Sequence, residues 1–236
     1  MRAQFALKMM TLGRWAFFWL MLLGIAGCGK DASPEAPIGD LPEIGPADPP
    51  YLPAVVYPNG LQLDLIRDAT LTGSYPNPGG NPFGARRDRH YARVVYFVDL
   101  TRAPVSQRVS ANFQLSEYVN PTLNRGGTRA YVDVQIVDHV QQIRSGLGRP
   151  LILNSAFRSP LHNRSVGGAT FSRHIYGDAA DIDVDQGRPD ASQRAQEIFN
   201  EARDVGVDFI SPLSETSVAV DGDIRVSWIH MDDRGF

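Results

Sequence analysis

Cysteine is almost absent from this chain. Its 236 residues include only Cys28, so no disulfide can join two parts of the chain, and a fold stapled by disulfides is excluded. The Gly-x-Ser-x-Gly elbow that presents a nucleophilic serine is also missing, which argues against the common type of serine hydrolase.

An excess of positive charge is missing as well. The formal net charge is −3 at pH 7. Removing residues 1–27 takes away three positive charges and no negative ones, which makes the formal charge −6. Nucleic acid is therefore not an expected partner, because binding to it depends on basic residues that neutralise phosphates.

The apolar run from Trp15 to Leu23 is too short to span a membrane, which needs about 20 apolar residues. It follows a basic segment with Arg2, Lys8 and Arg14. This order is typical of a signal peptide, so we expect residues 1–27 to be a leader. A buried apolar helix is the alternative.

Cys28 follows Ile25-Ala-Gly27, and this segment resembles the lipobox of bacterial lipoproteins, in which the cysteine is acylated. The resemblance implies a lipoprotein of the cell envelope, held to the membrane by a lipid on Cys28. Gly29 follows the cysteine, so the Asp that retains some lipoproteins at the inner membrane is missing. We expect the outer membrane, with the protein facing the periplasm.

Residues 28–53 contain seven prolines and few large apolar side chains, a composition that favours an extended spacer over a packed core. A proline-rich docking motif is the alternative. The next region, 54–110, is predicted to be β-rich, since Leu61–Leu65 alternates and Arg93–Val98 is β-branched and aromatic. The cluster Arg86, Arg87, Arg89 and His90 fits a solvated loop better than an anion site.

In residues 111–236 the spacing of apolar side chains predicts helices and strands more clearly. An apolar stripe predicts a helix over 132–147 that stops at Gly148, with His139 at its surface or boundary. A second stripe predicts a helix over 191–205. Expected strands are 151–153, 207–210, 217–220 and 224–231, the last after a hairpin signal at Asp221-Gly222.

Two segments carry metal-binding chemistry. The first runs Ser172-Arg-His174-Ile-Tyr-Gly177-Asp-Ala179-Ala-Asp181, and the second is Trp228-Ile-His230-Met-Asp232. Catalytic zinc takes about three nitrogen or oxygen ligands and keeps one position for water. His174, Asp181 and His230 meet that count, and the water on such a metal can attack a carbonyl without an activated serine or cysteine.

These segments resemble the zinc D-alanyl-D-alanine peptidases and murein endopeptidases, whose fold is shared with the Hedgehog signalling domain. Ser155-Ala-Phe-Arg158-Ser-Pro160 is similar to that family's Ser-Gly-Tyr-Arg-Ser stretch, and 172–181 matches its first metal motif. The resemblance covers residues 113–232. It implies an α+β fold, with a mainly antiparallel sheet flanked by helices.

The resemblance also implies roles for particular residues. Zn²⁺ would be held by His174, Asp181 and His230, and Arg158 would contact the substrate or the developing oxyanion. Ser172 and Asp183 are candidates for accepting hydrogen bonds from the ligand imidazoles, and Gly177 and Ala179 make room in a tight turn.

The sequence departs from the family at one position. Many members carry an acidic general base three residues before the last histidine, where this chain has Ser227. A serine cannot accept a proton from water at neutral pH as a carboxylate can. Asp232 is the first candidate base, with Glu215 and Asp223 as alternatives.

The expected function is hydrolysis of amide bonds in peptidoglycan peptides, as a cross-link endopeptidase or a D,D-carboxypeptidase. The alternative is a lipoprotein that binds peptidoglycan or zinc without turnover, which Ser227 would explain. The residues give no sign of the oligomeric state.

Overall fold

The computed structural model describes residues 53–185, 187–220 and 223–236. The predicted leader, lipidation site and most of the spacer lie outside these residues. The described residues fall within one compact unit, Pro46–Phe236. No helix among them is long and apolar enough to cross a membrane.

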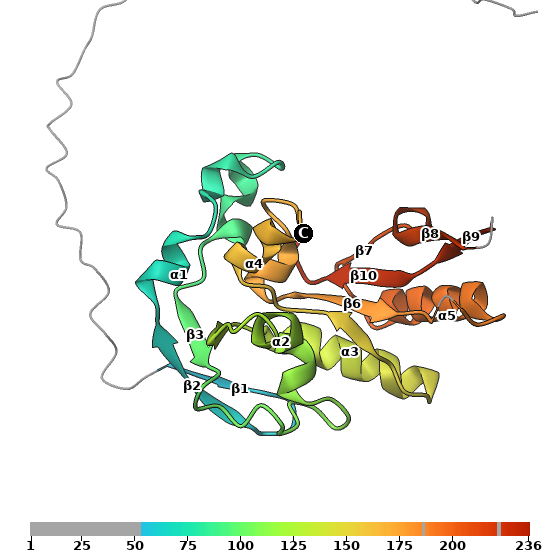
Figure 1. Cartoon of the computed structure of the whole chain (residues 1–236), viewed down its shortest axis with the longest axis horizontal. Coiled ribbons are helices and arrows are strands. Elements are labelled where there is room, and N and C mark those ends of the chain that lie inside the picture. Colours follow the sequence, from blue (N-terminus) through green and yellow to red (C-terminus); the bar gives the residue numbers. More distant parts are fainter. Residues whose placement is uncertain (1–52, 186, 221–222) are drawn as a thin grey trace, which may run out of the picture. The chain divides into compact units, whose positions relative to one another are not determined.

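The region 54–110 supplies most of a four-stranded antiparallel sheet (Figure 1). Leu63 and Leu65 are buried while Gln62 and Asp64 are exposed, which is the alternation expected of a strand with one face on the core. The strands, in sheet order, are β1 (Ala54–Val56), β2 (Gln62–Arg67), β3 (Tyr96–Asp99) and β4 (Arg129–Ala130).

Three short helical segments between β2 and β3 were not predicted. Asp68 caps the first, since its side chain accepts a hydrogen bond from the backbone N–H of Leu71. Asn77 caps the second in the same way through Gly79. Caps of this kind stabilise short helical turns that have no apolar period to reveal them. The segments are α1 (Ala69–Gly73), η1 (Pro78–Gly80) and η2 (Ala85–Tyr91).

The longer helices follow the predicted stripes closely. The helix expected over 132–147 begins two residues later, because Asp133 caps it, and it ends at Gly148, whose φ of 61° is left-handed. His139 on this helix is buried rather than at the surface, and its Nδ1 lies 2.9 Å from Asp233 Oδ1. The helices are α2 (Leu115–Leu123), α3 (Val134–Leu147), α4 (Pro160–Ser165) and α5 (Ala191–Asp204).

A second antiparallel sheet forms the centre of the unit (Figure 1). The strand predicted at 151–153 is shifted towards the C-terminus, and the long strand predicted at 224–231 is divided at Ser227 into two. In sheet order the strands are β5 (Leu153–Ser155), β6 (Ala179–Asp183), β10 (Trp228–Asp232) and β7 (Phe209–Ile210). A separate hairpin pairs β8 (Ser217–Val220) with β9 (Asp223–Val226).

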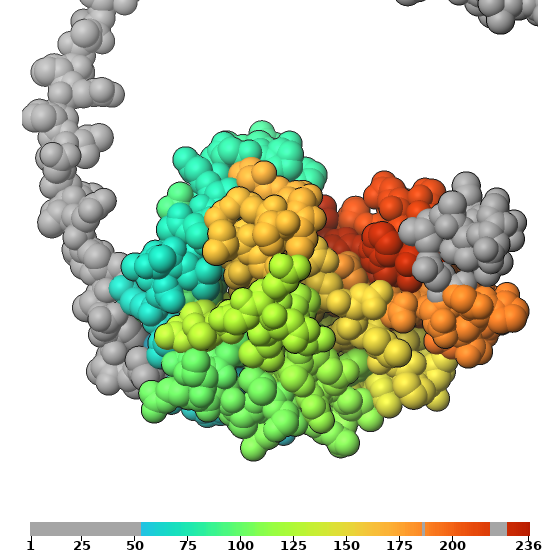
Figure 2. Space-filling model, viewed as in Figure 1, coloured from blue at the N-terminus to red at the C-terminus, as the bar shows by residue number. Residues whose placement is uncertain are grey.

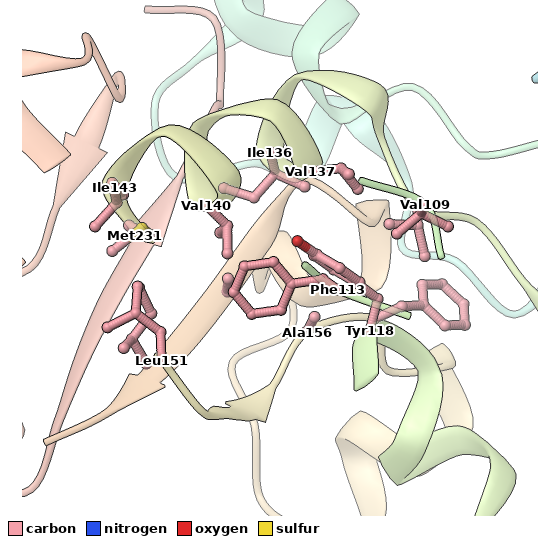
Figure 3. Packing of buried hydrophobic residues seen from close by; sticks show 14 of the residues in the cluster. Val109, Phe113, Tyr118, Ile136, Val137, Val140, Ile143, Leu151, Ala156 and Met231 are labelled. Atoms are coloured by element: carbon pink, nitrogen blue, oxygen red, sulfur yellow. The ribbon is translucent and has the colours of Figure 1, made fainter. Parts of the chain in front are cut away.

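One face of the second sheet belongs to the hydrophobic core. Ala180, Ile182, Ile229 and Met231 point to this face and are fully buried, while the residues between them point to the other face. Side chains of α3 gather with those of residues 109–118 in the same core (Figure 3). We call this set, which also includes Leu63, Val98 and Ile198, the main core.

A smaller group of buried residues lies apart from the main core. It joins β3 and η2 to the short helix η3 (Arg173–Tyr176), and we call it the aromatic cluster: Tyr75, Tyr91, Phe97, Ile175 and Tyr176. On the surface, residues 75–92 continue into the segment around α4 (Figure 2), and Tyr91 packs edge-on against Phe171.

The α+β class and the antiparallel sheets with flanking helices are confirmed. The predicted boundary between 54–110 and 111–236 stays a prediction. In this structure both regions contribute side chains to the main core.

Candidate metal centre

Two neighbouring strands bring Asp181 and His230 together. The residues are direct partners across the antiparallel pair of β6 and β10. Their neighbours Ile182 and Ile229 point into the main core, so strand alternation turns Asp181 and His230 to the opposite face. Distant parts of the sequence thus supply adjacent side chains.

His174 approaches the same point from η3. This 3-10 turn ends at Gly177, which has a left-handed φ of 79°. A Cβ atom at Gly177 would lie 2.2 Å from the backbone oxygen of Tyr131, and Ala179 is fully buried. The turn that presents His174 therefore requires the small residues of the motif.

The three predicted ligands meet at one place. His174 Nε2 lies 3.2 Å from Asp181 Oδ1, and His230 Nδ1 lies 2.8 Å from the same oxygen. One ligand atom from each residue lies within 4.8 Å of the other two. This arrangement agrees with the ligand set predicted from the sequence.

Each imidazole is also held by its other nitrogen. His174 Nδ1 lies 2.6 Å from the carbonyl oxygen of Ala156, to which it can only donate, so Nε2 keeps its lone pair for a metal. His230 Nε2 lies 3.2 Å from Asp232 Oδ2. Such outer contacts orient metal-binding histidines and strengthen them as ligands.

The electrostatics suit a divalent cation. Burial alone would raise the pKa of the Asp181 carboxyl, but His174 and His230 hold that pKa well below its ordinary value. Burial lowers the pKa of His230, yet hydrogen bonds to Asp181 and Asp232 outweigh it and raise the pKa to about 9. Two imidazoles and a carboxylate, each with an outer partner, fit zinc.

Arg158 lies beside the ligands and donates hydrogen bonds to two neighbouring residues. Its Nη2 donates to Asp181 Oδ2 at 2.8 Å, and its Nε donates to Ser155 Oγ at 2.7 Å. The guanidinium therefore orients Asp181 and faces the same cavity. Its Nη1 makes no hydrogen bond within the described part of the chain, which leaves this donor for a substrate oxygen.

A general base has to face the cavity, but Asp232 does not line it. Its side chain is fully buried, and it is bound by His230 Nε2 and by Arg234 Nε at 2.6 Å. Although burial raises its pKa, the hydrogen bond from Arg234 lowers it below the ordinary value. The geometry suits a residue that holds His230 in place.

Glu215, another candidate base, does not line the cavity either. Glu215 is exposed on η4 (Leu213–Thr216), and the side chain of Asp223 lies outside the described ones. The cavity has a volume of about 440 Å³ and opens to the surface. Among described residues its lining is Asn154, Ser155, Arg158, Ser172, His174, Asp181, Trp228 and His230. Asp181 is thus the only carboxylate in that lining.

Two predicted supporting residues make other contacts. Neither Ser172 nor Asp183 accepts a hydrogen bond from a ligand imidazole in the described structure. The carbonyl of Ala156 does so for His174, and no side-chain pattern could have revealed it. Asp232 was recognised in the sequence, but for another role.

A buried ion pair supports the loop that carries His174. The Arg173 guanidinium donates to the Asp178 carboxylate and, through Nη1, to the carbonyl of His90 at 2.6 Å. It also lies over the rings of Tyr91 and Tyr176, 5.1 and 4.7 Å from their centroids. The aromatic cluster therefore ties region 54–110 to the metal-binding loop.

Comparison with known proteins agrees with the resemblance drawn from the motifs. Residues 111–210 match the family described as Peptidase M15. A stretch of 44 residues is 48% identical to a zinc D-Ala-D-Ala carboxypeptidase of Streptomyces albus G. That stretch is 18% of this chain and 17% of the relative. The similarity therefore extends over only a small part of each protein.

Proposed function

We propose that this protein, whose residues 111–210 match the Peptidase M15 family, is a zinc peptidase that hydrolyses amide bonds in the peptide part of peptidoglycan. The observation that carries the proposal is the meeting of three ligand atoms within 4.8 Å of one another on the floor of an open cavity. Each ligand side chain is fixed by a second contact, as expected of a built metal site.

Zinc would be held by His174 Nε2, Asp181 Oδ1 and His230 Nδ1. When bound, it lowers the pKa of its water and polarises the carbonyl that is attacked. Side chains of the protein orient the ligands and bind the substrate. Arg158 keeps Asp181 oriented. Its Nη1, which has no hydrogen bond among the described residues, is a donor for the substrate carbonyl or for the charge that develops on it.

Cleavage of cross-links is the activity we favour, with D,D-carboxypeptidase activity as the alternative within the same class. The cavity opens at the surface, so a peptide that continues on both sides of the cleaved bond can reach the ligands. The relative from Streptomyces albus G is described as a carboxypeptidase, which supports the alternative.

A non-catalytic lipoprotein that binds zinc or peptidoglycan is the second candidate. Ser227 takes the place of the usual acid, and the described lining of the cavity has no carboxylate other than Asp181. A site of this kind would bind metal and peptide without turnover.

Incubation of the zinc-loaded protein with cross-linked muropeptides distinguishes these functions. An endopeptidase releases monomers with a new amine, whereas a carboxypeptidase releases free D-alanine. His230→Ala is the matched control and should give neither product. A protein that carries one zinc per chain and yields no product would support the non-catalytic function.

We also propose that the protein is tethered in the cell envelope through a lipid on Cys28, at the outer membrane and facing the periplasm. The support is the sequence of residues 1–28. Metabolic labelling with a radioactive fatty acid should mark the wild-type protein and leave Cys28→Ala unlabelled. A labelled Cys28→Ala protein would contradict this assignment.

A further inference from the structure

The sheet face that carries Asp181 and His230 continues beyond them. Side chains two residues apart share a strand face, so Asp183 lies on the same face of β6 as Asp181. Trp228 likewise shares the face of His230 on β10. Asp183 and Trp228 are direct partners across the two strands, which brings their Cβ atoms to about 5 Å. They form a second row, about 7 Å along the strands from the metal ligands.

Asn154 borders this second row on the other side of β6. The pairing of β5 with β6 shifts register between Leu153 and Ser155, so Asn154 occupies a bulge. A bulge re-aims a side chain, and Asn154 is exposed and lines the same cavity as Trp228.

The polar groups of these three residues are available to a ligand. Asp183 Oδ1 accepts a hydrogen bond from the backbone N–H of Asp185 at 3.1 Å. Within the described part of the chain its Oδ2 has no hydrogen bond and no cationic side chain pairs with it. The Asn154 amide and the Trp228 indole N–H are equally without partners there.

The chemistry of this second row differs from that of the metal ligands. A bound metal ion and Arg158 would attract the carbonyl oxygen of the substrate or a negatively charged group. A carboxylate and an amide oxygen accept N–H bonds, and an indole ring attracts a cation within about 6 Å of its centroid. Asp183, Asn154 and Trp228 together therefore favour an ammonium group.

We propose that Asp183, Trp228 and Asn154 form a subsite for a free ammonium group of the substrate, adjacent to the amide that is cleaved. The inference rests on the proposed peptidase function and narrows its substrate to peptides with a primary amine close to the scissile bond. A spacing of about 7 Å is two residues of an extended peptide, or one residue with a long side chain.

The test compares a cross-linked muropeptide whose free amino group is intact with the same muropeptide after acetylation. Acetylation removes the positive charge and leaves the cleaved bond unchanged. The wild-type protein should cleave the free amine with a kcat/KM about tenfold higher, the scale of one charge-assisted contact. In Asp183→Asn the two substrates should be cleaved at about equal rates.

Asp185→Asn is the matched control, because it removes an exposed negative charge just beyond the end of β6 and leaves Asp183, Asn154 and Trp228 unchanged. This variant should keep the wild-type preference. Equal cleavage of both muropeptides by the wild-type protein would overturn the subsite. A preference that persists in Asp183→Asn would overturn it too.

Binding separates failure of the subsite from failure of the peptidase function. Trp228 is the only tryptophan after the leader, so its fluorescence reports binding next to the metal in the zinc-loaded mature chain. Without any hydrolysis, tighter binding of the free amine that is lost in Asp183→Asn still supports the subsite. Absence of binding, or equal binding of both muropeptides, rejects it.

Discussion

The main core and the aromatic cluster are filled in different ways. The main core consists of aliphatic and aromatic side chains between α3, α5 and the sheets. The aromatic cluster surrounds a buried ion pair, Arg173–Asp178, whose arginine lies over the rings of Tyr91 and Tyr176. The main core stabilises the unit as a whole, while the aromatic cluster positions the segment next to His174.

The difference shows what region 54–110 contributes. Its strands add Leu63, Leu65 and Val98 to the main core, and its helical turns reach the metal-binding loop through the carbonyl of His90. Variants at four positions test whether the main core, the aromatic cluster and the metal centre have separate roles. They are given from the largest expected effect to the smallest.

His174→Ala should remove the metal site and leave both hydrophobic clusters intact. Loss of an outer partner costs a metal site about 10- to 100-fold, so loss of a ligand should lower zinc affinity and turnover by more than about 100-fold. Zinc content after dialysis, turnover and thermal unfolding of the zinc-free protein measure this. The zinc-free variant should still unfold cooperatively, at a somewhat lower temperature because His174 is buried and bonded to the Ala156 carbonyl. A variant that retains one zinc per chain would contradict the assignment.

Arg173→Met should destabilise the aromatic cluster by about 4 kcal/mol, because it leaves the Asp178 carboxylate buried without its partner. Zinc affinity should fall as well, since Arg173 precedes His174. Denaturant unfolding and a zinc titration provide the measurements. The double variant Arg173→Met with Asp178→Leu is the control and should recover much of the stability. No recovery would mean that the arginine contributes through its ring contacts and not through charge.

Ile143→Ala should destabilise the main core by about 3 kcal/mol through lost burial and a cavity. Ile143 is fully buried on α3 and packs in the main core, on the sheet face opposite to Asp181 and His230, so the folded protein should bind zinc as tightly as the wild type. Unfolding and zinc titration on the same samples test both statements. If zinc affinity falls as much as in Arg173→Met, the two clusters do not have separate roles.

Asp232→Ala should weaken zinc binding by about 10- to 100-fold, as expected for an outer partner of a ligand histidine. Asp232→Asn keeps an oxygen that can accept from His230 Nε2 and should restore part of the affinity. Competition with a zinc-binding dye measures both. Unchanged zinc affinity together with slow turnover in both variants would return Asp232 to the role of general base.

Prediction from the sequence succeeded where the signal is local. The stripe of α3 follows from side chains three and four residues apart, and its end follows from Gly148, which alone tolerates the left-handed turn without strain. The capped turns at Asp68 and Asn77 were missed because they contain no apolar period. The buried position of His139 depends on Asp233, which lies 94 residues further along the chain.

The residue types of the metal centre were determined by the sequence alone, because the spacing from His174 to Asp181 and the Trp-x-His-x-Asp segment are local patterns. The tertiary structure decided what surrounds them. Strand pairing set Asp181 beside His230, placed Asp232 behind the imidazole and brought Trp228 next to Asp183. Such neighbours depend on sheet order and register, which join residues that are far apart in the chain.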